Sequence, residues 1–425
     1  MTETNKNGKL IAIITMCFIF AMISFVTNMG APFGNIWGFE YPFAKAWGNL
    51  MNFAAYLFMG IPAGKMLTKY GYKKTALIAL IVGIVGLCFQ YLSSLVGAGS
   101  YVFTYDSIPV ALNLIIYLLG AFICGFCVCM LNTVVNPMLN LLGGGGNKGN
   151  QLIQVGGTLN SLTGTLTPLL AGILVGTVTK DTSMSDVAPL LFIGMAVFAI
   201  SFVIISRVSI PEPTLGKVEP KYERSPLAFR HCMLGVIAIF FYVGIEIGIS
   251  MELNFYVTKL PFEGAAAIGG SLAAAYWLLM MIGRACSSAI SGKVSTKLQL
   301  SAASAVAIIL LLIAIFMPES VTIDFNGHDV PAKAFLIPAC GLCTSVMWGG
   351  IFNLSVEGLG KYTEAASGTF MTMVVGGGVM PLIQEAMANS GGEIFSYWLV
   401  IAMLAYILFY ALIGSKNVNT DIKVD

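Results

Sequence analysis

Charged residues are scarce in this chain. Only 10% of its 425 residues are Asp, Glu, Lys or Arg, whereas soluble proteins carry about 25%. With 57% hydrophobic residues, a soluble fold would lack the polar coat that keeps a protein dispersed in water. The net charge of +2 also lacks the basic bias typical of nucleic-acid binders. The composition therefore excludes a soluble enzyme, a nucleic-acid binder and a disordered chain. It leaves a helical protein that crosses a membrane several times.

Histidine is nearly absent as well, with two residues in the whole chain. No spacing of His, Asp and Glu suits a metal site, and no nucleophile motif is visible. The nine Cys lie in apolar runs or open one, where Cys packs as a small hydrophobe. These absences disfavour a membrane-embedded enzyme or sensor. We expect a protein that is not an enzyme and that holds no metal and no cofactor.

Long apolar runs, in contrast, are abundant. A membrane-spanning helix needs about 20 mostly apolar residues. The sequence predicts an all-α membrane protein with twelve transmembrane helices, at 10–36, 45–66, 75–97, 110–140, 151–177, 188–206, 233–258, 265–291, 299–317, 334–356, 367–388 and 394–414.

One loop divides these helices six and six. Residues 207–232 contain four prolines and much of the chain's clustered charge. We predict an N-terminal six-helix bundle at 1–206, a cytoplasmic linker at 207–232, and a C-terminal six-helix bundle with a short tail at 233–425. His231 falls in this linker, where we expect it to be solvated. The halves also resemble each other weakly, because Asn136 and Asn353 each precede a Leu-Gly pair at the same offset.

The distribution of Lys and Arg predicts the orientation. The N-terminus, the loops after even-numbered helices and the C-terminal tail hold 17 of these residues, and the opposite side holds 4. Cytoplasmic loops carry the excess of Lys and Arg. Both termini are therefore expected in the cytoplasm, in a multi-pass protein.

Polar residues within the spans form stripes at helical spacing. Asn132, Asn136 and Asn140 lie one turn apart, and the helix at 233–258 repeats the pattern with Tyr242 and Asn254. Carboxamides donate and accept hydrogen bonds, which suits sugar hydroxyls, and aromatic faces suit the apolar faces of a pyranose. The alternative is hydrogen bonding between helices. The candidate substrate-binding residues are Asn28, Asn52, Asn132, Asn136, Gln154, Asn160, Tyr242, Asn254, Trp277, Trp348 and Asn353.

Two carboxyl groups lie well inside a span, Glu246 and Glu252, and both are candidates for ion coupling. They point about 120° apart around one helix, at 100° per residue. Burial disfavours the charged form of a carboxyl, so Glu246 is a candidate to take up a proton near neutral pH. It could instead hold Na⁺ or form a structural pair with Arg284. Glu252 lies nearer the outer end and could be a solvated vestibule group.

The chain resembles the fucose/proton symporter branch of the major facilitator superfamily, which includes bacterial glucose/galactose transporters. The matching stretches are 59–64, 70–74, Asn136-Pro137, Asn160-Ser161, 242–246, Tyr276-Trp277, Gly283-Arg284, Ile351-Phe352 and Leu359-Gly360. Together they span nearly the whole chain. The resemblance implies two bundles of parallel order around a mid-membrane site, in a bacterial inner membrane, with inward sugar transport driven by an ion gradient.

The chain also departs from that branch. An Asp of the symporter's first helix matches Asn28, and a Glu of its fourth helix matches Asn132. A Gln of its fifth helix matches Gly157, while the following Asn matches Asn160. An amide cannot cycle a proton at physiological pH. If coupling survives, Glu246 is the remaining deep acid.

We therefore predict a secondary transporter that imports a neutral sugar, a hexose or small saccharide, by alternating access. A proton or sodium gradient drives it. The expected partners are that sugar and the lipid bilayer, with no nucleic acid, and the protein is expected to be a monomer. Two alternatives remain, an uncoupled sugar facilitator and an exporter of drug-like or lipid molecules.

Overall fold

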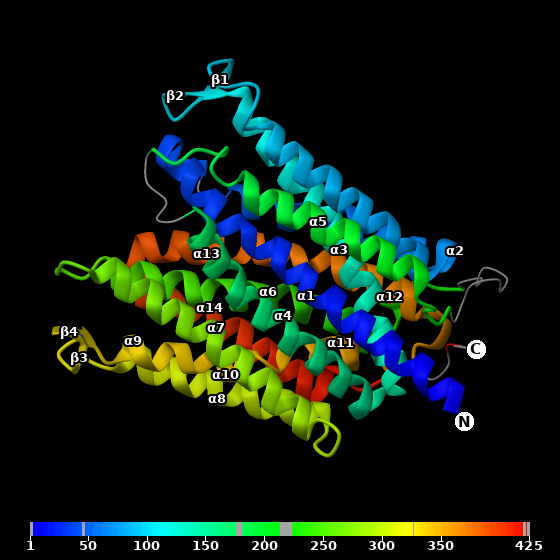
Figure 1. Cartoon of the computed structure of the whole chain (residues 1–425). Coiled ribbons are helices and arrows are strands. Elements are labelled where there is room, and N and C mark those ends of the chain that lie inside the picture. The colour runs from blue at the N-terminus through cyan, green and yellow to red at the C-terminus, as the bar shows by residue number, and fades with distance from the viewer. Residues whose placement is uncertain are drawn as a thin grey trace. The chain divides into compact units, whose positions relative to one another are not determined.

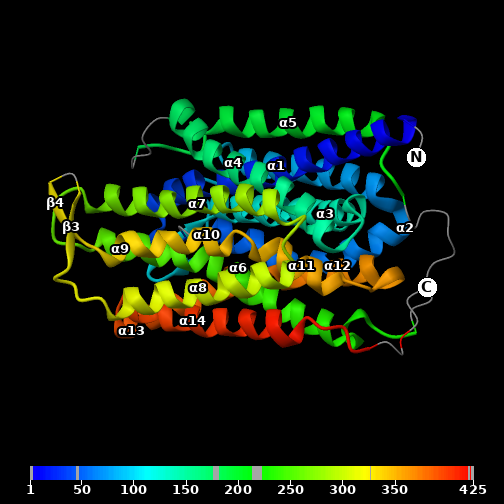
Figure 2. The same cartoon turned by 90° about the horizontal axis from the view of Figure 1, so that it is seen from below.

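The computed structural model describes residues 3–44, 47–175, 181–212, 223–325, 327–419 and 422. Helices dominate it (Figures 1 and 2). The long helices are α1 (Glu3–Glu40), α2 (Trp47–Leu92), α3 (Leu112–Gly143), α4 (Gly146–Val175), α5 (Ala188–Arg207), α6 (Arg230–Thr258), α7 (Ala265–Ile290), α8 (Thr296–Phe316), α13 (Gly376–Gly391) and α14 (Glu393–Phe409). The shorter helices are η1 (Pro42–Ala44), η2 (Pro226–Ala228), α9 (Lys333–Leu336), η3 (Ile337–Ala339), α10 (Cys340–Thr344), α11 (Met347–Val356), η4 (Gly360–Tyr362), α12 (Thr363–Thr372), η5 (Met373–Val375) and the π-helical η6 (Tyr410–Gly414).

Ten helical stretches of the described chain are long and apolar enough to cross a membrane. One of them, α2, has 46 residues and contains Gly71, whose φ of +82° interrupts the helix. It therefore contains two of the predicted spans. The 30-residue α4 corresponds to the predicted span at 151–177, and it is the most polar of the long helices. The prediction of an all-α membrane protein is confirmed, and the helices are consistent with twelve spans.

The break at Gly71 is capped from another segment. The Glu212 carboxylate accepts hydrogen bonds from the backbone N–H groups of Tyr72 (2.7 Å) and Lys73 (2.8 Å). These N–H groups begin the second half of α2, and a carboxylate is favourable at a helix N-terminus. The Lys73 ammonium donates to the Val208 carbonyl at 2.8 Å, which fastens the end of α5 to the same place.

Two β-hairpins join helices where the sequence analysis expected only loops. Strands β1 (Tyr101–Tyr105) and β2 (Ile108–Ala111) pair antiparallel before α3. Strands β3 (Thr322–Phe325) and β4 (His328–Pro331) pair antiparallel before α9. Asp106 and Ser107 form the first turn with φ values of +48° and +64°, as a two-residue hairpin turn requires.

Helix α6 begins earlier than the span predicted at 233–258. Residues 213–222 of the predicted linker lie outside the described residues, but α6 already begins at Arg230. The expectation that His231 is solvated is wrong. This side chain is fully buried in the first turn of α6, and its Nε2 lies 3.0 Å from the Glu357 carbonyl oxygen.

The chain forms two compact units. One contains Met1–Met138, Leu162–Lys221 and Ser367–Thr372, and the other contains Leu139–Ser161, Tyr222–Ala366 and Met373–Asp425. The division into two bundles at the linker stays a prediction. In the second unit, α6 packs against α7, α11, α13 and α14. A Cβ at Gly376 would contact the Phe240 backbone and one at Gly244 would contact Met380, so glycines let α6 and α13 approach closely.

Candidate functional site

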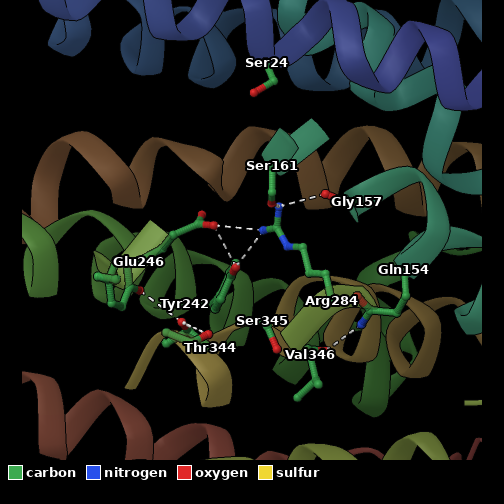
Figure 3. A network of polar contacts seen from close by, with 12 residues as sticks. Ser24, Gln154, Gly157, Ser161, Tyr242, Glu246, Arg284, Thr344, Ser345 and Val346 are labelled. Atoms are coloured by element: carbon green, nitrogen blue, oxygen red, sulfur yellow. Dashed lines mark hydrogen bonds and ion pairs between the residues drawn. The ribbon is translucent and has the colours of Figure 1, made fainter. Parts of the chain in front are cut away.

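A buried ion pair joins the middle of α6 to the C-terminal half of α7 (Figure 3). The Arg284 Nη2 lies 3.0 Å from the Glu246 Oε1, and the two side chains are only 10% and 14% exposed. The Tyr242 hydroxyl donates to the same carboxylate oxygen at 2.9 Å. Because Tyr242 and Glu246 are one helical turn apart, both face the guanidinium. The pairing with Arg284 that the sequence analysis left open is therefore present.

Helix α4 supplies the other side of the guanidinium. Arg284 Nη1 donates to the Ser161 Oγ at 2.7 Å and to the Gly157 carbonyl at 3.3 Å. A Cβ at Gly157 would lie 3.4 Å from the Arg284 Cδ, an ordinary van der Waals contact, so the arginine side chain lies directly against α4. Ionised groups are tolerated here because each finds polar partners. The charges compensate each other, so the site is neutral overall.

Aromatic and hydroxyl groups line the same region of the second unit. The Trp348 ring stands edge-on to Tyr242, with 6.3 Å between the ring centroids. Trp348 is half-buried, while Tyr242 is fully buried. The Tyr276 and Thr344 hydroxyls lie 3.0 Å apart. Because Tyr242, Tyr276 and Thr344 are fully buried, the half-buried indole is the group of this set that can contact a pyranose ring.

Amides form a second polar cluster in this unit. The Asn353 Nδ2 donates to the Asn140 Oδ1 (3.1 Å) and to the Gly146 carbonyl (3.0 Å). The Gln154 Nε2 donates to the Val346 carbonyl at 3.3 Å. These bonds hold the end of α3 and the start of α4 against α11 and the residue before it. An open hollow of about 450 Å³ lies beside Asn353, and its lining includes the charged residues Lys297, Glu357 and Lys416.

Four of the predicted site residues belong to the first unit. Asn132 donates to the Tyr56 hydroxyl at 2.9 Å, and Asn136 donates to the Asn132 carbonyl at 2.8 Å. Asn28 donates to the Ser24 carbonyl at 2.8 Å. Asn52 borders a cavity of about 20 Å³. A volume of about 10–15 Å³ already holds one water, so this cavity is too small for a sugar.

The remaining candidates lie in the second unit. Asn160 is half-buried on α4, one residue before Ser161. Asn254 accepts a hydrogen bond from the Thr258 hydroxyl at 3.2 Å. Trp277 is 36% exposed and stands edge-on to Tyr276. The structure therefore gathers Gln154, Asn160, Tyr242, Asn254, Trp277, Trp348 and Asn353 in one unit, and Asn28, Asn52, Asn132 and Asn136 in the other.

Glu252 differs from the expectation of a solvated vestibule group. Its side chain is fully buried, and neither carboxylate oxygen has a hydrogen-bond partner among the described residues. Sequence reasoning also missed Gln384, a fully buried amide on α13. The signal was available, because Gln384 is a lone amide three residues after Pro381 in an apolar stretch.

Comparison with known families places this architecture. The sequence profile of the Major Facilitator Superfamily matches residues 11–381, which is most of the chain. The chain belongs to the major facilitator superfamily. The predicted resemblance is confirmed, and this facilitator is a multi-pass membrane transporter, not an enzyme.

Several proteins similar to this chain are named as transporters. A glucose/galactose transporter of Brucella abortus is 31% identical over 376 residues, which cover 86% of this chain and 84% of that protein. The L-fucose-proton symporter of Escherichia coli is 20% identical over 383 residues, which cover 83% of this chain and 81% of that protein. The crystal structure of the E. coli fucose:proton symporter superposes with a TM-score of 0.79 at 18% identity, covering 96% of this chain and all of that one.

Proposed function

We propose that this transporter imports a neutral hexose across a bacterial inner membrane by alternating access. Glucose and galactose are the first candidate substrates. The observation that carries the proposal is the neutral polar site around Arg284, with Trp348 beside Tyr242. Its charges are internally paired, so an ionic substrate would have no unpaired charge to meet. Indole, hydroxyl and amide groups are the partners that sugars need.

The relatives support the same substrate class. A protein named glucose/galactose transporter shares 31% of its residues with this chain over most of both lengths. The exporter alternative would require a cavity with a greasy lining, whereas the candidate residues are amides, hydroxyls and aromatic rings. We also propose that both termini lie in the cytoplasm and that the protein works as a monomer driven by a proton or sodium gradient, with no other cofactor.

Uptake of labelled sugars into proteoliposomes tests this proposal. We expect glucose or galactose to accumulate above the external concentration under an imposed ion gradient, and disaccharides to enter more slowly. Equilibration without accumulation would favour the uncoupled facilitator. If no sugar in a panel of glucose, galactose, mannose, fucose and N-acetylglucosamine crosses the membrane, the proposal is wrong.

A further inference from the structure

One face of α6 points a buried carboxyl toward a neighbouring helix. Gly244, Gly248 and Glu252 follow one another at four-residue intervals, so they lie on one side of α6 in successive turns. A Cβ at Gly244 would contact Met380, and one at Gly248 would contact the Gln384 Oε1, both on α13. Glu252 therefore continues the side of α6 that packs against α13, one turn beyond Gly248.

Glu252 carries no compensation of the kind that Glu246 has. Glu246 receives a guanidinium and a phenol, and its charged form is satisfied. Glu252 is fully buried, and both its oxygens lack a hydrogen-bond partner within the described part of the chain. An isolated ionised carboxyl in such surroundings is very costly, and a buried group of this kind becomes neutral instead.

Gln384 has a buried acceptor oxygen with no hydrogen-bond donor among the described residues. It is fully buried, and its Nε2 donates to the Ser396 Oγ at 3.3 Å. Its Oε1, which faces the α6 backbone at Gly248, has no hydrogen-bond donor among the described residues. An ionised carboxylate has no proton to offer this oxygen, whereas a protonated carboxyl has one O–H to donate.

The charged groups around Glu252 do not replace a counter-ion. Glu385 on α13 and Glu393 on α14 are themselves acidic, and their negative charges disfavour a negative charge on Glu252. The positive charge of Lys259, at the end of α6, favours a negative charge on Glu252. However, Lys259 forms an ion pair with Glu393, and its side chain is 66% exposed. The Tyr397 hydroxyl of α14 interacts electrostatically with Glu252, but it donates its hydrogen bond to the Ile249 carbonyl at 2.9 Å.

We propose that Glu252 is a proton-binding site of this transporter, neutral while α6 and α13 are packed as described, with Gln384 as the acceptor of its O–H. The proton passes to water when the carboxyl becomes hydrated during the transport cycle, and the carboxylate takes up a new proton on the other side. A metal cation fits less well, because hard cations such as Ca²⁺ take about six to eight oxygen ligands. This inference rests on the proposed sugar uptake.

Proteoliposomes carrying wild type, Glu252→Gln or Glu263→Gln test the inference. Glu263 is an exposed acid just after α6, so Glu263→Gln makes the same chemical change at a solvated position. We expect wild type and Glu263→Gln to accumulate sugar under an inward proton gradient. Glu252→Gln should keep sugar exchange in the absence of a gradient within about twofold, lose accumulation, and lose the pH dependence of exchange. Accumulation by Glu252→Gln equal to wild type, or accumulation driven by sodium and not by protons, would overturn the proton site.

A direct measurement separates this inference from the proposed function. Infrared spectra of the purified protein should contain a band from a protonated buried carboxyl that Glu252→Gln lacks and Glu263→Gln retains. If wild type moves no sugar but has this band, the proposed function fails and the proton site stands. If Glu252→Gln does not fold, Gln384→Leu replaces it. That variant keeps the carboxyl but removes its acceptor, so the band should shift and proton-driven uptake should require lower pH. An unshifted band and unchanged uptake would contradict the pairing.

Discussion

The buried pair of Glu246 and Arg284 gives the sharpest test of how the second unit is held together. In Glu246→Gln, the guanidinium loses its only anionic partner among the described residues while staying 10% exposed. Breaking a buried ion pair by removing one partner costs about 3–5 kcal/mol, because the remaining charge is uncompensated. We expect a loss of unfolding free energy of about this size, measured by denaturant titration in mixed micelles.

A double-mutant cycle distinguishes pairing from ordinary damage at the site. Arg284→Gln alone should cost a similar amount, since it strands the carboxylate and removes the donors to Ser161 and Gly157. The variant with both changes has no stranded charge, so its loss should fall short of the sum of the two single losses by at least about 1 kcal/mol. Additive losses would refute the reasoning. The exposed control Glu263→Gln should change stability by less than about 0.5 kcal/mol.

The remaining predictions concern single contacts. Trp348→Ala should raise the KM for sugar about two- to tenfold in uptake assays, because an aromatic contact is worth about 0.5–1.5 kcal/mol, and an unchanged KM would remove Trp348 from the site. Asn353→Ala breaks two hydrogen bonds to the corner between α3 and α4, so hydrogen exchange there should become faster, and equal protection would argue against the contact. Gly248→Ala places a methyl group against Gln384 and should lower stability by about 1–3 kcal/mol, which thermal unfolding measures. Glu212→Ala removes two N-terminal hydrogen bonds from the second half of α2 and should cost about 1–2 kcal/mol, whereas unchanged unfolding would show that the cap is dispensable.

The fold was largely predictable because a membrane-spanning helix is recognisable in the sequence as a run of about 20 mostly apolar residues. The polar α4 was predicted as a span, although it is not among the ten described stretches that are long and apolar enough to cross a membrane. The hairpins were not predicted, although Asn326-Gly327 between alternating residues is a strong hairpin signal. Short exposed strands contribute little to any pattern of 20 apolar residues, so a search for spans passes over them.

The site was predictable in its residue types and less so in its partners. Helical spacing put Tyr242 and Glu246 on one face, and the structure joins them to Arg284. The same spacing could not say that Glu252 is buried with no hydrogen-bond partner among the described residues, since burial depends on which helix covers that face. Contacts such as Gln384 with α6 link residues more than 100 positions apart, and periodicity within one helix carries no information about them.

The two hairpins share one backbone arrangement. Each is closed by a hydrogen bond from the residue after its second strand. The Leu112 N–H donates to the Ser100 carbonyl, and the Ala332 N–H donates to the Val321 carbonyl, both at 2.8 Å. One hairpin follows the third predicted span and the other follows the ninth. The same backbone arrangement thus recurs after the third and the ninth predicted spans, in agreement with the weak internal repeat that the sequence predicts.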